Sequence, residues 1–352
     1  MHKIAILGFG TVGSGVFDTI NINSRQIINR LGDGIEVSHI LDRRRFEGHI
    51  LAKCVTDDIN DIISDPETEV VVEAMGGLHP AYEFSLAAIN AGKSVVTSNK
   101  ECVEHFGAEL EAAARENGVC YLYEASAGGG IPCVHTLHNC LAWGKIKRVA
   151  GILNGTTNFI LTKMLDQQLP FDEALAMAQR LGFAEADPTA DICGHDSARK
   201  ICILGGIAWD RYIRYDDISR VVGITDITCD DLVSADRMGY AIKLIAMAEC
   251  GDSGITLSVC PMLVHKEHIF ASVSGSYNAV SILGATADEV VLYGRGAGSL
   301  PTANAVLSDV IETLTSHPVP RVRGGNIAIV KSQSDVIDEC TLSSGKKMRI
   351  FG

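Results

Sequence analysis

A short stretch near the start of the chain has the spacing of a phosphate-binding turn. It follows an apolar run directly and leads directly into a helical pattern. In such a Gly-x-Gly-x-x-Gly turn the first glycine allows a tight bend, the second lets the backbone approach a pyrophosphate, and the third lets the helix pack on the strand. The helix N-terminus then offers N–H groups to the phosphates. The motif predicts dinucleotide binding, against the alternative of a turn without a ligand. Its residues are Gly8, Phe9, Gly10, Thr11, Val12 and Gly13.

The end of the second apolar run bears on which dinucleotide would bind. Asp42 lies there, and its carboxylate can accept a hydrogen bond from a ribose hydroxyl, which favours NAD. Arg43, Arg44 and Arg45 follow at once, and an arginine such as Arg43 could hold the 2′-phosphate of NADP. The sequence leaves this choice open.

Ionisable residues are also concentrated between residues 182 and 200, at Glu185, Asp191, Asp196 and Lys200. Asp196 and Lys200 stand four residues apart, so on a helix they share a face with the acid on the N-terminal side. The residues after Lys200 are almost wholly apolar, which predicts a buried helix whose charged end lines a cleft. Because a buried charge needs a partner and often has a function, this segment is a candidate site. The alternative is a surface ion pair.

Two further patterns could bind cations. Glu124 is followed by small residues with accessible carbonyl groups, and such all-oxygen surroundings suit a hard cation. The alternative is a glycine turn between domains, with Glu124 solvated. The second pattern, Cys133 to Cys140 with two histidines, is spaced as in some zinc sites. On a helix Cys133 and Cys140 would share a face while His135 points partly away, so core residues explain it better.

The elements that must position these residues change along the chain. In the first 125 residues, apolar runs alternate with helical patterns, and the runs lie at 3–7, 36–41, 70–75, 94–99 and 119–125. Short, continuously apolar strands are typical of a parallel sheet covered on both faces. We therefore predict an α/β domain of the doubly wound, Rossmann type.

A different arrangement is predicted after residue 128. Helical patterns come first, and strand-like runs follow; the helices are expected at 134–143, 158–168, 171–182 and 195–209, and the strands at 254–264 and 289–294. This order predicts a second, α+β domain. Residues 301–314 form another helical pattern, and the tail from Pro318 onward shows only two apolar patches.

Composition narrows the class of protein. The chain has 352 residues, with 43 acidic against 30 basic side chains and a net charge of −13, which makes nucleic acid a poor expected partner. Its apolar stretches fall short of the ~20 residues of a membrane span. Eleven cysteines without a Cys-x-x-Cys pair indicate reduced thiols. We expect a cytoplasmic protein that is not exported.

Several segments together resemble homoserine dehydrogenase, over nearly the whole chain. They are GFGTVGSGV, TSNKE, YEASAGGGIP, GILNGTTNFIL, GFAEADPTADICGHDSARK and GAGSLPTANAVLSD, in this order. The resemblance implies the interconversion of L-homoserine and L-aspartate 4-semialdehyde with NADP or NAD. This step leads towards threonine, isoleucine and methionine.

By this resemblance, Lys100 and Lys200 match the family's two lysines near the reacting carbonyl, with Asp196 as a third catalytic residue. Glu185 and Asp191 would join Lys200 in binding substrate. Hydride transfer to an aldehyde leaves an alkoxide that needs a proton and a positive charge nearby, and a lysine supplies both. Carboxylates can bind the substrate's ammonium group. Lys100 and Gly298 are also assigned to the cofactor site.

The resemblance further implies a monovalent cation, sodium or potassium, bound by the Glu124 carboxylate and three carbonyl groups. Those carbonyl groups would be the ones of Ala127, Gly129 and Ile131. Family members are typically dimers, and the contacts are expected after Gly128 and around residues 263–298.

Domain bounds are expected at 1–127 with 299–317 for the dinucleotide-binding domain, and at 128–298 for the catalytic and dimerisation domain. The tail, 318–352, is expected to add a strand or hairpin. It is too short for the threonine-binding regulatory domain of many relatives, since independent domains below ~40 residues rarely fold unaided. A short, monofunctional form is therefore expected, one that threonine inhibits only weakly.

Two other functions deserve comparison. A semialdehyde dehydrogenase that oxidises its aldehyde needs a nucleophilic cysteine with a nearby base, but Cys102 and Cys120 have no adjacent histidine-rich motif. A non-catalytic NAD(P)-binding sensor has no need of both lysines and all the acids. We therefore expect an oxidoreductase.

Overall fold

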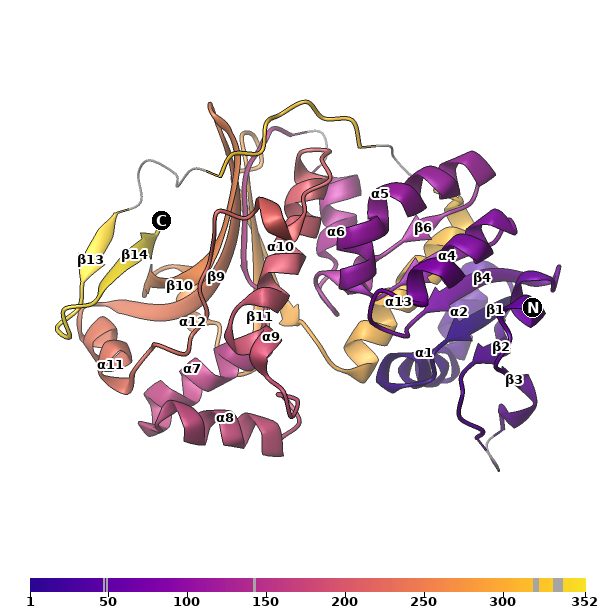
Figure 1. Ribbon diagram of the computed structural model, residues 1–352, viewed down its shortest axis with the longest axis horizontal. Coiled ribbons are helices and arrows are strands. Elements are labelled where there is room, and N and C mark those ends of the chain that lie inside the picture. Colours follow the sequence, from indigo (N-terminus) through magenta and orange to yellow (C-terminus); the bar gives the residue numbers. More distant parts are fainter. Residues whose placement is uncertain (47, 49, 142–143, 319–322, 332–337) are drawn as a thin grey trace. The chain divides into compact units, whose positions relative to one another are not determined.

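The computed structural model describes residues 1–46, 48, 50–141, 144–318, 323–331 and 338–352. The chain divides into two compact units, each built from two stretches of chain (Figure 1). The first comprises Met1–Val134 and Ala297–Gly324, and the second comprises His135–Gly296 and Gly325–Gly352. None of the helices in the described part of the chain is long and apolar enough to cross a membrane.

A six-stranded, all-parallel sheet forms the centre of the first unit, in the order β3-β2-β1-β4-β5-β6. The order reverses between β1 and β4, and ligands of such sheets bind outside the carboxyl ends of the strands at this point. The predicted doubly wound fold is thereby confirmed. The strands are β1 (His2–Leu7), β2 (Ile35–Leu41), β3 (Val55–Thr56), β4 (Thr68–Glu73), β5 (Ser94–Thr97) and β6 (Tyr121–Leu122).

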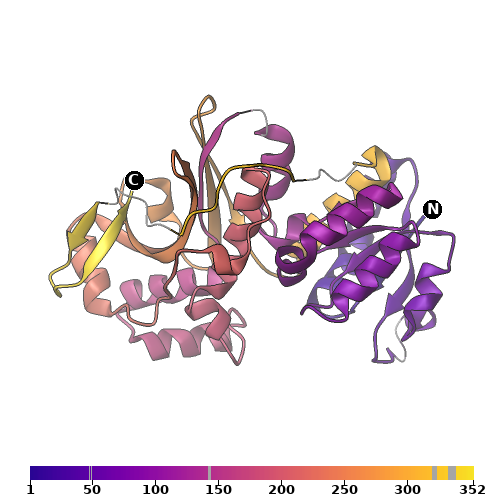
Figure 2. The ribbon, with the colours of Figure 1, turned by 45° about the horizontal axis from the view of Figure 1, so that its top comes forward.

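Helices cover this sheet, and α4 and α5 lie side by side over it in both ribbon views (Figure 1 and Figure 2). The last helix, α13, returns to the unit and packs on α1, where Ser299 Oγ donates to the Thr11 carbonyl at 2.8 Å. The helices are α1 (Thr11–Ile22), α2 (Ser24–Leu31), η1 (Ala52–Cys54), α3 (Ile59–Ile63), α4 (Ala81–Asn90), α5 (Lys100–Asn117), η2 (Glu124–Ser126) and α13 (Ser299–Ser316).

The second unit contains an eight-stranded mixed sheet in the order β12-β11-β7-β9-β10-β14-β13, with β8 also paired to β10. Most neighbours are antiparallel, but β8 and β14 run parallel to β10. Figure 2 shows the terminal hairpin, in yellow, beside this sheet. The strands are β7 (Ile146–Ile152), β8 (Arg220–Val221), β9 (Tyr240–Gly251), β10 (Gly254–His265), β11 (Tyr277–Gly284), β12 (Glu289–Arg295), β13 (Glu339–Thr341) and β14 (Lys347–Phe351).

The helices of the second unit agree largely with the sequence patterns. The longest, α10, begins after Gly194 and buries nearly all of its length. The predicted α+β arrangement is confirmed. The helices are η3 (Thr136–Cys140), α7 (Gly155–Gln167), α8 (Phe171–Arg180), α9 (Thr189–Ile192), α10 (His195–Ala208), η4 (Tyr215–Asp217), α11 (Cys229–Arg237) and α12 (Ile269–Ser272).

Three local predictions were wrong: the helix at 134–143, the shared face of Cys133 and Cys140, and the full length of the strand at 119–125. Residues 134–143 do not form a regular helix: one α turn, α6 (Cys133–His135), leads into the π-helical turn η3, and residues 142–143 lie outside the described part. Because the period changes there, Cys133 is buried and Cys140 is exposed, so they share no face. The strand expected at 119–125 is reduced to β6, since the chain enters a 3-10 turn at Glu124.

Candidate active site

The glycine motif forms a tight turn between β1 and α1. Gly8 has a φ of +88°, and a Cβ there would lie 2.9 Å from the Ala74 carbonyl oxygen, at the carboxyl end of the neighbouring β4. A Cβ on Gly13 would lie 2.1 Å from the Gly8 oxygen, so only glycine allows this helix–strand contact. Gly10 has open space where a Cβ would stand and caps α1 without a side-chain hydrogen bond. The turn therefore fits a bound pyrophosphate.

The other residues of this turn are placed differently. Thr11 and Gly10 are exposed, Val12 is half-buried, and Phe9 is buried against the core. The Phe9 N–H donates to Asp42 Oδ2 at 2.9 Å, so the turn and the end of β2 are joined.

Asp42 is held by Arg44 rather than Arg43. The guanidinium of Arg44 donates from Nε to Oδ1 at 2.9 Å and from Nη2 to Oδ2 at 2.7 Å. These bonds, and those from two backbone N–H groups, hold the pKa of the Asp42 carboxyl well below its usual range. Arg43 is exposed, and its side chain makes no hydrogen bond or ion pair with any other described residue.

Lys100 and Gly298 lie at the N-terminal ends of two helices of the first unit. Lys100 is the first residue of α5, directly after β5, and the Asn99 side chain caps this helix by accepting from the Cys102 N–H at 3.1 Å. Asn99 Nδ2 also donates to the Gly77 carbonyl at 2.6 Å. Gly298 precedes α13 with a φ of +120°. Lys100 therefore lies at the same edge of the sheet as the glycine turn, where the parallel strands end.

The second unit gathers a buried polar cluster at the start of α10. Lys200 Nζ lies 2.8 Å from Asp196 Oδ2 and donates to the Leu153 carbonyl at 2.8 Å. Asn154 Nδ2 donates to Asp191 Oδ1 at 2.7 Å and to Asp196 Oδ2 at 2.9 Å. Asn154 also caps α7, accepting from the Thr157 N–H. One amide thus bridges two carboxylates that would otherwise repel each other.

Burial sets the electrostatics of this cluster. Asn154, Asp196 and Lys200 are 4%, 5% and 8% exposed, and Asp191 is half-buried. Burial, and then the nearby charge of Asp196, raises the pKa of the Asp191 carboxyl. Two carboxylates and one ammonium together carry a net negative charge, which suits a cationic group of a ligand. The Asp196–Lys200 pair predicted from the sequence therefore forms inside the second unit, and a surface ion pair is excluded.

Glu185 does not join this cluster. Its side chain is exposed and makes no hydrogen bond or ion pair with the other described residues. Its backbone carbonyl accepts from Gln179 Nε2 at 3.1 Å. Asn154, in contrast, belongs to the cluster but was not predicted from the sequence; the signal was its position just before Gly-Thr-Thr at a helix start.

Glu124 and three small neighbours form a buried, oxygen-rich turn in the first unit. Glu124, Ala127, Gly129 and Ile131 are all buried, with Gly129 at a φ of +58°. Glu124 Oε1 accepts from the Val134 N–H at 2.9 Å, and the Ile131 carbonyl accepts from the Cys133 N–H at 2.8 Å.

A second carboxyl lies beside this turn. Asp309 of α13 is buried, and its Oδ2 accepts from the Glu124 N–H at 2.8 Å. Burial and the charge of Glu124 raise the pKa of Asp309 well above its usual value. No group of three His, Cys, Asp or Glu side chains that could hold a metal ion is found among the described residues. Carbonyl oxygens would have to complete any cation site here.

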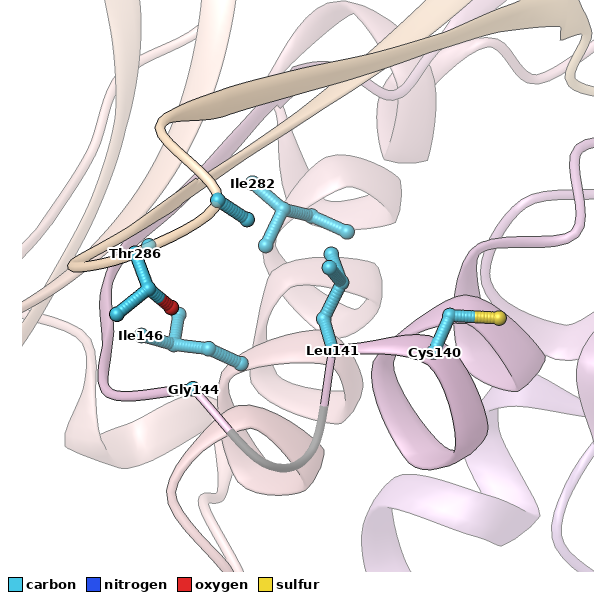
Figure 3. A pocket seen from close by; sticks show the side chains of 8 residues that line it. Cys140, Leu141, Gly144, Ile146, Ile282 and Thr286 are labelled. Carbon is cyan, nitrogen blue, oxygen red and sulfur yellow. The ribbon is translucent and has the colours of Figure 1, made fainter.

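A cavity of about 180 Å³ lies at one end of β7 and β11 (Figure 3). The side chains of Leu141, Ile146, Ile282 and Thr286 line it, and none of its lining residues is charged. It therefore lacks the groups that would bind a charged amino acid, unlike the cluster around Asn154.

Comparisons with known proteins agree with this geometry. A family model described as homoserine dehydrogenase matches residues 132–311, and one described as the homoserine dehydrogenase NAD binding domain matches residues 8–124. The homoserine dehydrogenase of Bacillus subtilis is 39% identical over 315 residues, covering 89% of this chain and 72% of that protein.

Solved structures give the same result. A homoserine dehydrogenase from Thiobacillus denitrificans superposes with a TM-score of 0.88 at 38% identity, covering 93% of this chain and 79% of that one. A hyperthermophilic archaeal homoserine dehydrogenase in complex with NADPH has a TM-score of 0.77 at 26% identity, covering 91% of this chain and 99% of that one. The chain thus belongs to the homoserine dehydrogenase family, NAD(P)-dependent oxidoreductases that interconvert L-homoserine and L-aspartate 4-semialdehyde.

Proposed function

We propose that Lys200 is the acid–base residue of this reaction and that Asp196 positions it. The observation that carries this is the place of Lys200 Nζ, 2.8 Å from Asp196 Oδ2 in a buried site. A bound nicotinamide supplies or accepts the hydride. When the aldehyde is reduced, Nζ donates a proton to the oxygen that becomes the hydroxyl, and in the reverse direction Nζ accepts it. The positive charge also stabilises the developing alkoxide.

Asp191 and Glu185 are proposed to bind the substrate's ammonium group. Asp191 is already fixed by Asn154, which supports a role in a preformed site. Glu185 is exposed, so it would have to reach the substrate after binding. We expect Glu185→Ala to raise the KM for homoserine while kcat changes little, and a loss confined to kcat would argue against this role.

The first unit is proposed to bind the dinucleotide and the second unit the substrate. Open space at Gly10 supports the pyrophosphate site, and Lys100 and Gly298 flank the same sheet edge from α5 and α13. The bidentate Asp42–Arg44 pair supports NADP, because the arginine offsets the carboxylate that would repel a 2′-phosphate. Initial rates of homoserine-dependent reduction with NAD and with NADP test this preference directly.

A structural sodium or potassium ion is proposed at Glu124, Ala127, Gly129 and Ile131. A buried carboxylate with neighbouring carbonyl oxygens is a donor set that suits such ions. The ion would also offset the negative charge of Glu124 next to Asp309.

A homodimer in a reducing cytoplasm is proposed as the working state. All eleven cysteines are free, which supports the compartment. The dimer is inferred from the family resemblance alone, with contacts after Gly128 and around residues 263–298. Analytical ultracentrifugation tests it, and a monomer at micromolar concentration would contradict it.

A further inference from the structure

A basic cavity lies under the C-terminal hairpin of the second unit. It has a volume of about 220 Å³ and is lined by residues of β8, β10 and the β13–β14 hairpin. Four of its lining residues are cationic and two are acidic, although the whole chain has a net charge of −13. The charged lining residues are Arg220, Asp226, Glu339, Lys346, Lys347 and Arg349.

The four cations are held to different degrees. Lys346 Nζ is engaged by Asp231 Oδ2 at 3.1 Å and by the Asp226 carbonyl. Arg349, on β14, is buried with 8% exposure. Arg220 and Lys347 are exposed, and their side chains form no ion pair or hydrogen bond with other described residues. Two cations thus keep their donors available for a ligand.

The fold directs these charges to one place. Arg220 on β8 pairs with Ser258 on β10, and Cys260, two residues further on the same face, lines the cavity. Burial raises the pKa of the Cys260 thiol, while the charges of Arg220 and Arg349 act in the opposite direction. Two guanidinium groups from strands far apart in the chain therefore act on one buried spot.

One wall of this cavity also contacts the segment that carries the buried polar cluster around Asn154. Gly223 lines the cavity, yet a Cβ on it would lie only 1.9 Å from the Ile192 carbonyl oxygen. Ile224 N–H donates to the same oxygen at 2.8 Å. Ile192 follows Asp191 directly. A Cβ on Gly194 would lie 3.6 Å from the Val222 carbonyl oxygen, so residues 192–194 and 222–224 are close neighbours. Residues 222–224 thus contact the cavity on one side and the segment carrying Asp191 and Asp196 on the other.

We propose that this cavity binds a small polyanion, such as phosphate or a dicarboxylate, through Arg220 and Lys347 together with Arg349. Its occupancy would shift residues 222–224 and thereby the position of Asp191, so that the KM for homoserine changes while kcat changes little. The site is separate from the glycine turn, which lies in the other unit. Binding at the cavity does not depend on the roles proposed for Lys200 and Asp196, but its effect on KM rests on the proposed role of Asp191.

Calorimetric titration with inorganic phosphate, and separately with succinate, tests binding at constant ionic strength. Saturating NADP keeps phosphate away from the glycine turn. The double variant Arg220→Gln/Lys347→Gln should weaken binding at least about tenfold, because two charge-assisted contacts are lost. The control Lys147→Gln/Arg237→Gln removes the same charge from exposed residues of the same unit and should bind as the wild type does.

The two ligands and the two variants give distinct outcomes. Tighter binding of phosphate identifies a phosphate site, and tighter binding of succinate identifies a carboxylate site. Equal losses in both double variants, or no saturable binding at all, would overturn the site. Binding that leaves the KM for homoserine unchanged would overturn the coupling to Asp191. If Asp191→Asn has normal kinetics in the absence of anion, the proposed role of Asp191 fails instead, while binding still reports on the cavity.

Discussion

Lys200 Nζ lies 2.8 Å from Asp196 Oδ2, one helical turn earlier on α10, and also donates to the Leu153 carbonyl at 2.8 Å. Two acceptors thus hold the buried ammonium group of Lys200, and their positions determine the direction of its third N–H. Because the side chain is 10% exposed, water competes little for that proton. Such a preorganised cation can stabilise a developing alkoxide without having to reorient.

Replacing Lys200 by Met should remove the proton donor and the positive charge while keeping roughly the volume of the side chain. We expect kcat to fall by about 100-fold or more, since a general acid and a positive charge are both lost. NADPH affinity, measured by fluorescence titration, should stay unchanged. Lys147→Met, on the exposed face of β7, is the control and should keep wild-type turnover. Near-normal turnover of Lys200→Met would remove Lys200 from the acid–base role.

Asn154 donates a hydrogen bond to each of the two carboxylates that it bridges, Asp191 and Asp196. Asn154→Asp keeps an N-cap acceptor for α7 but replaces the bridging donor by a third carboxylate. The pKa of Asp191, already raised by burial, should rise further. If the ionised Asp191 binds the substrate's ammonium group, as we propose, the acidic limb of the kcat/KM profile should move to higher pH. An unshifted limb in the variant would show that Asp191 is not the group that titrates.

The sequence specified the parts of the site that are local in the chain. The glycine turn was predictable because its three glycines act through neighbouring backbone, and Asp196 with Lys200 because their spacing matches one helical turn. Asn154 was not predictable from spacing, since it reaches its two carboxylates across 37 and 42 residues. Asp309 likewise meets Glu124 across 185 residues.

Other differences arise because side-chain direction depends on tertiary context. Three consecutive arginines follow Asp42, and only the turn geometry decides that Arg44 pairs with it while Arg43 points to solvent. Strands β7, β9 and β11, which lie inside the second sheet, were not predicted. Apolar residues in these runs are interrupted by polar ones, such as Lys147 and Arg148 in β7, so no clear period separates strand from helix, and long-range pairing decides between the two structures.

Arg44 should set the preference between the two nicotinamide cofactors. Arg44→Gln leaves Asp42 without its bidentate partner, so an uncompensated carboxylate would face the ribose. We expect the KM for NADPH to rise at least about tenfold more than that for NADH. Arg43→Gln is the matched control, and its ratio of the two KM values should stay near that of the wild type. A larger effect of Arg43→Gln would transfer the role to Arg43.

The proposed cation site should be visible in thermal unfolding. Sodium or potassium chloride should raise the Tm above that in tetramethylammonium chloride by about 2–4 °C, as about 1 kcal/mol of binding free energy would. Glu124→Gln should remove this difference, because it removes the only negative charge assigned to the site. Glu116→Gln, at an exposed position of α5, should keep it. Equal Tm values in all three salts would refute the ion.

Lys243 should make the stability of the second unit depend on pH. Lys243 is 6% exposed, and its Nζ donates to Asn158 Oδ1 at 3.2 Å and to the Val273 carbonyl. Burial lowers the pKa of Lys243 to about 8. In the unfolded chain a lysine holds its proton up to about pH 10.4. Between these values the unfolded state binds more protons, so the free energy of unfolding contributed by this group rises with pH.

Lys243→Met should remove that contribution. Between about pH 7.5 and about pH 9.5, the free energy of unfolding of the wild type should rise by about 2 kcal/mol relative to the variant. Urea unfolding of both proteins at the two pH values measures this difference. Comparing wild type with variant cancels the titration of all other groups. Lys147→Met, at an exposed position, should follow the wild type. If wild type and Lys243→Met change in parallel with pH, Lys243 keeps an ordinary pKa and stays protonated throughout this range, because its hydrogen bonds then offset the cost of burial.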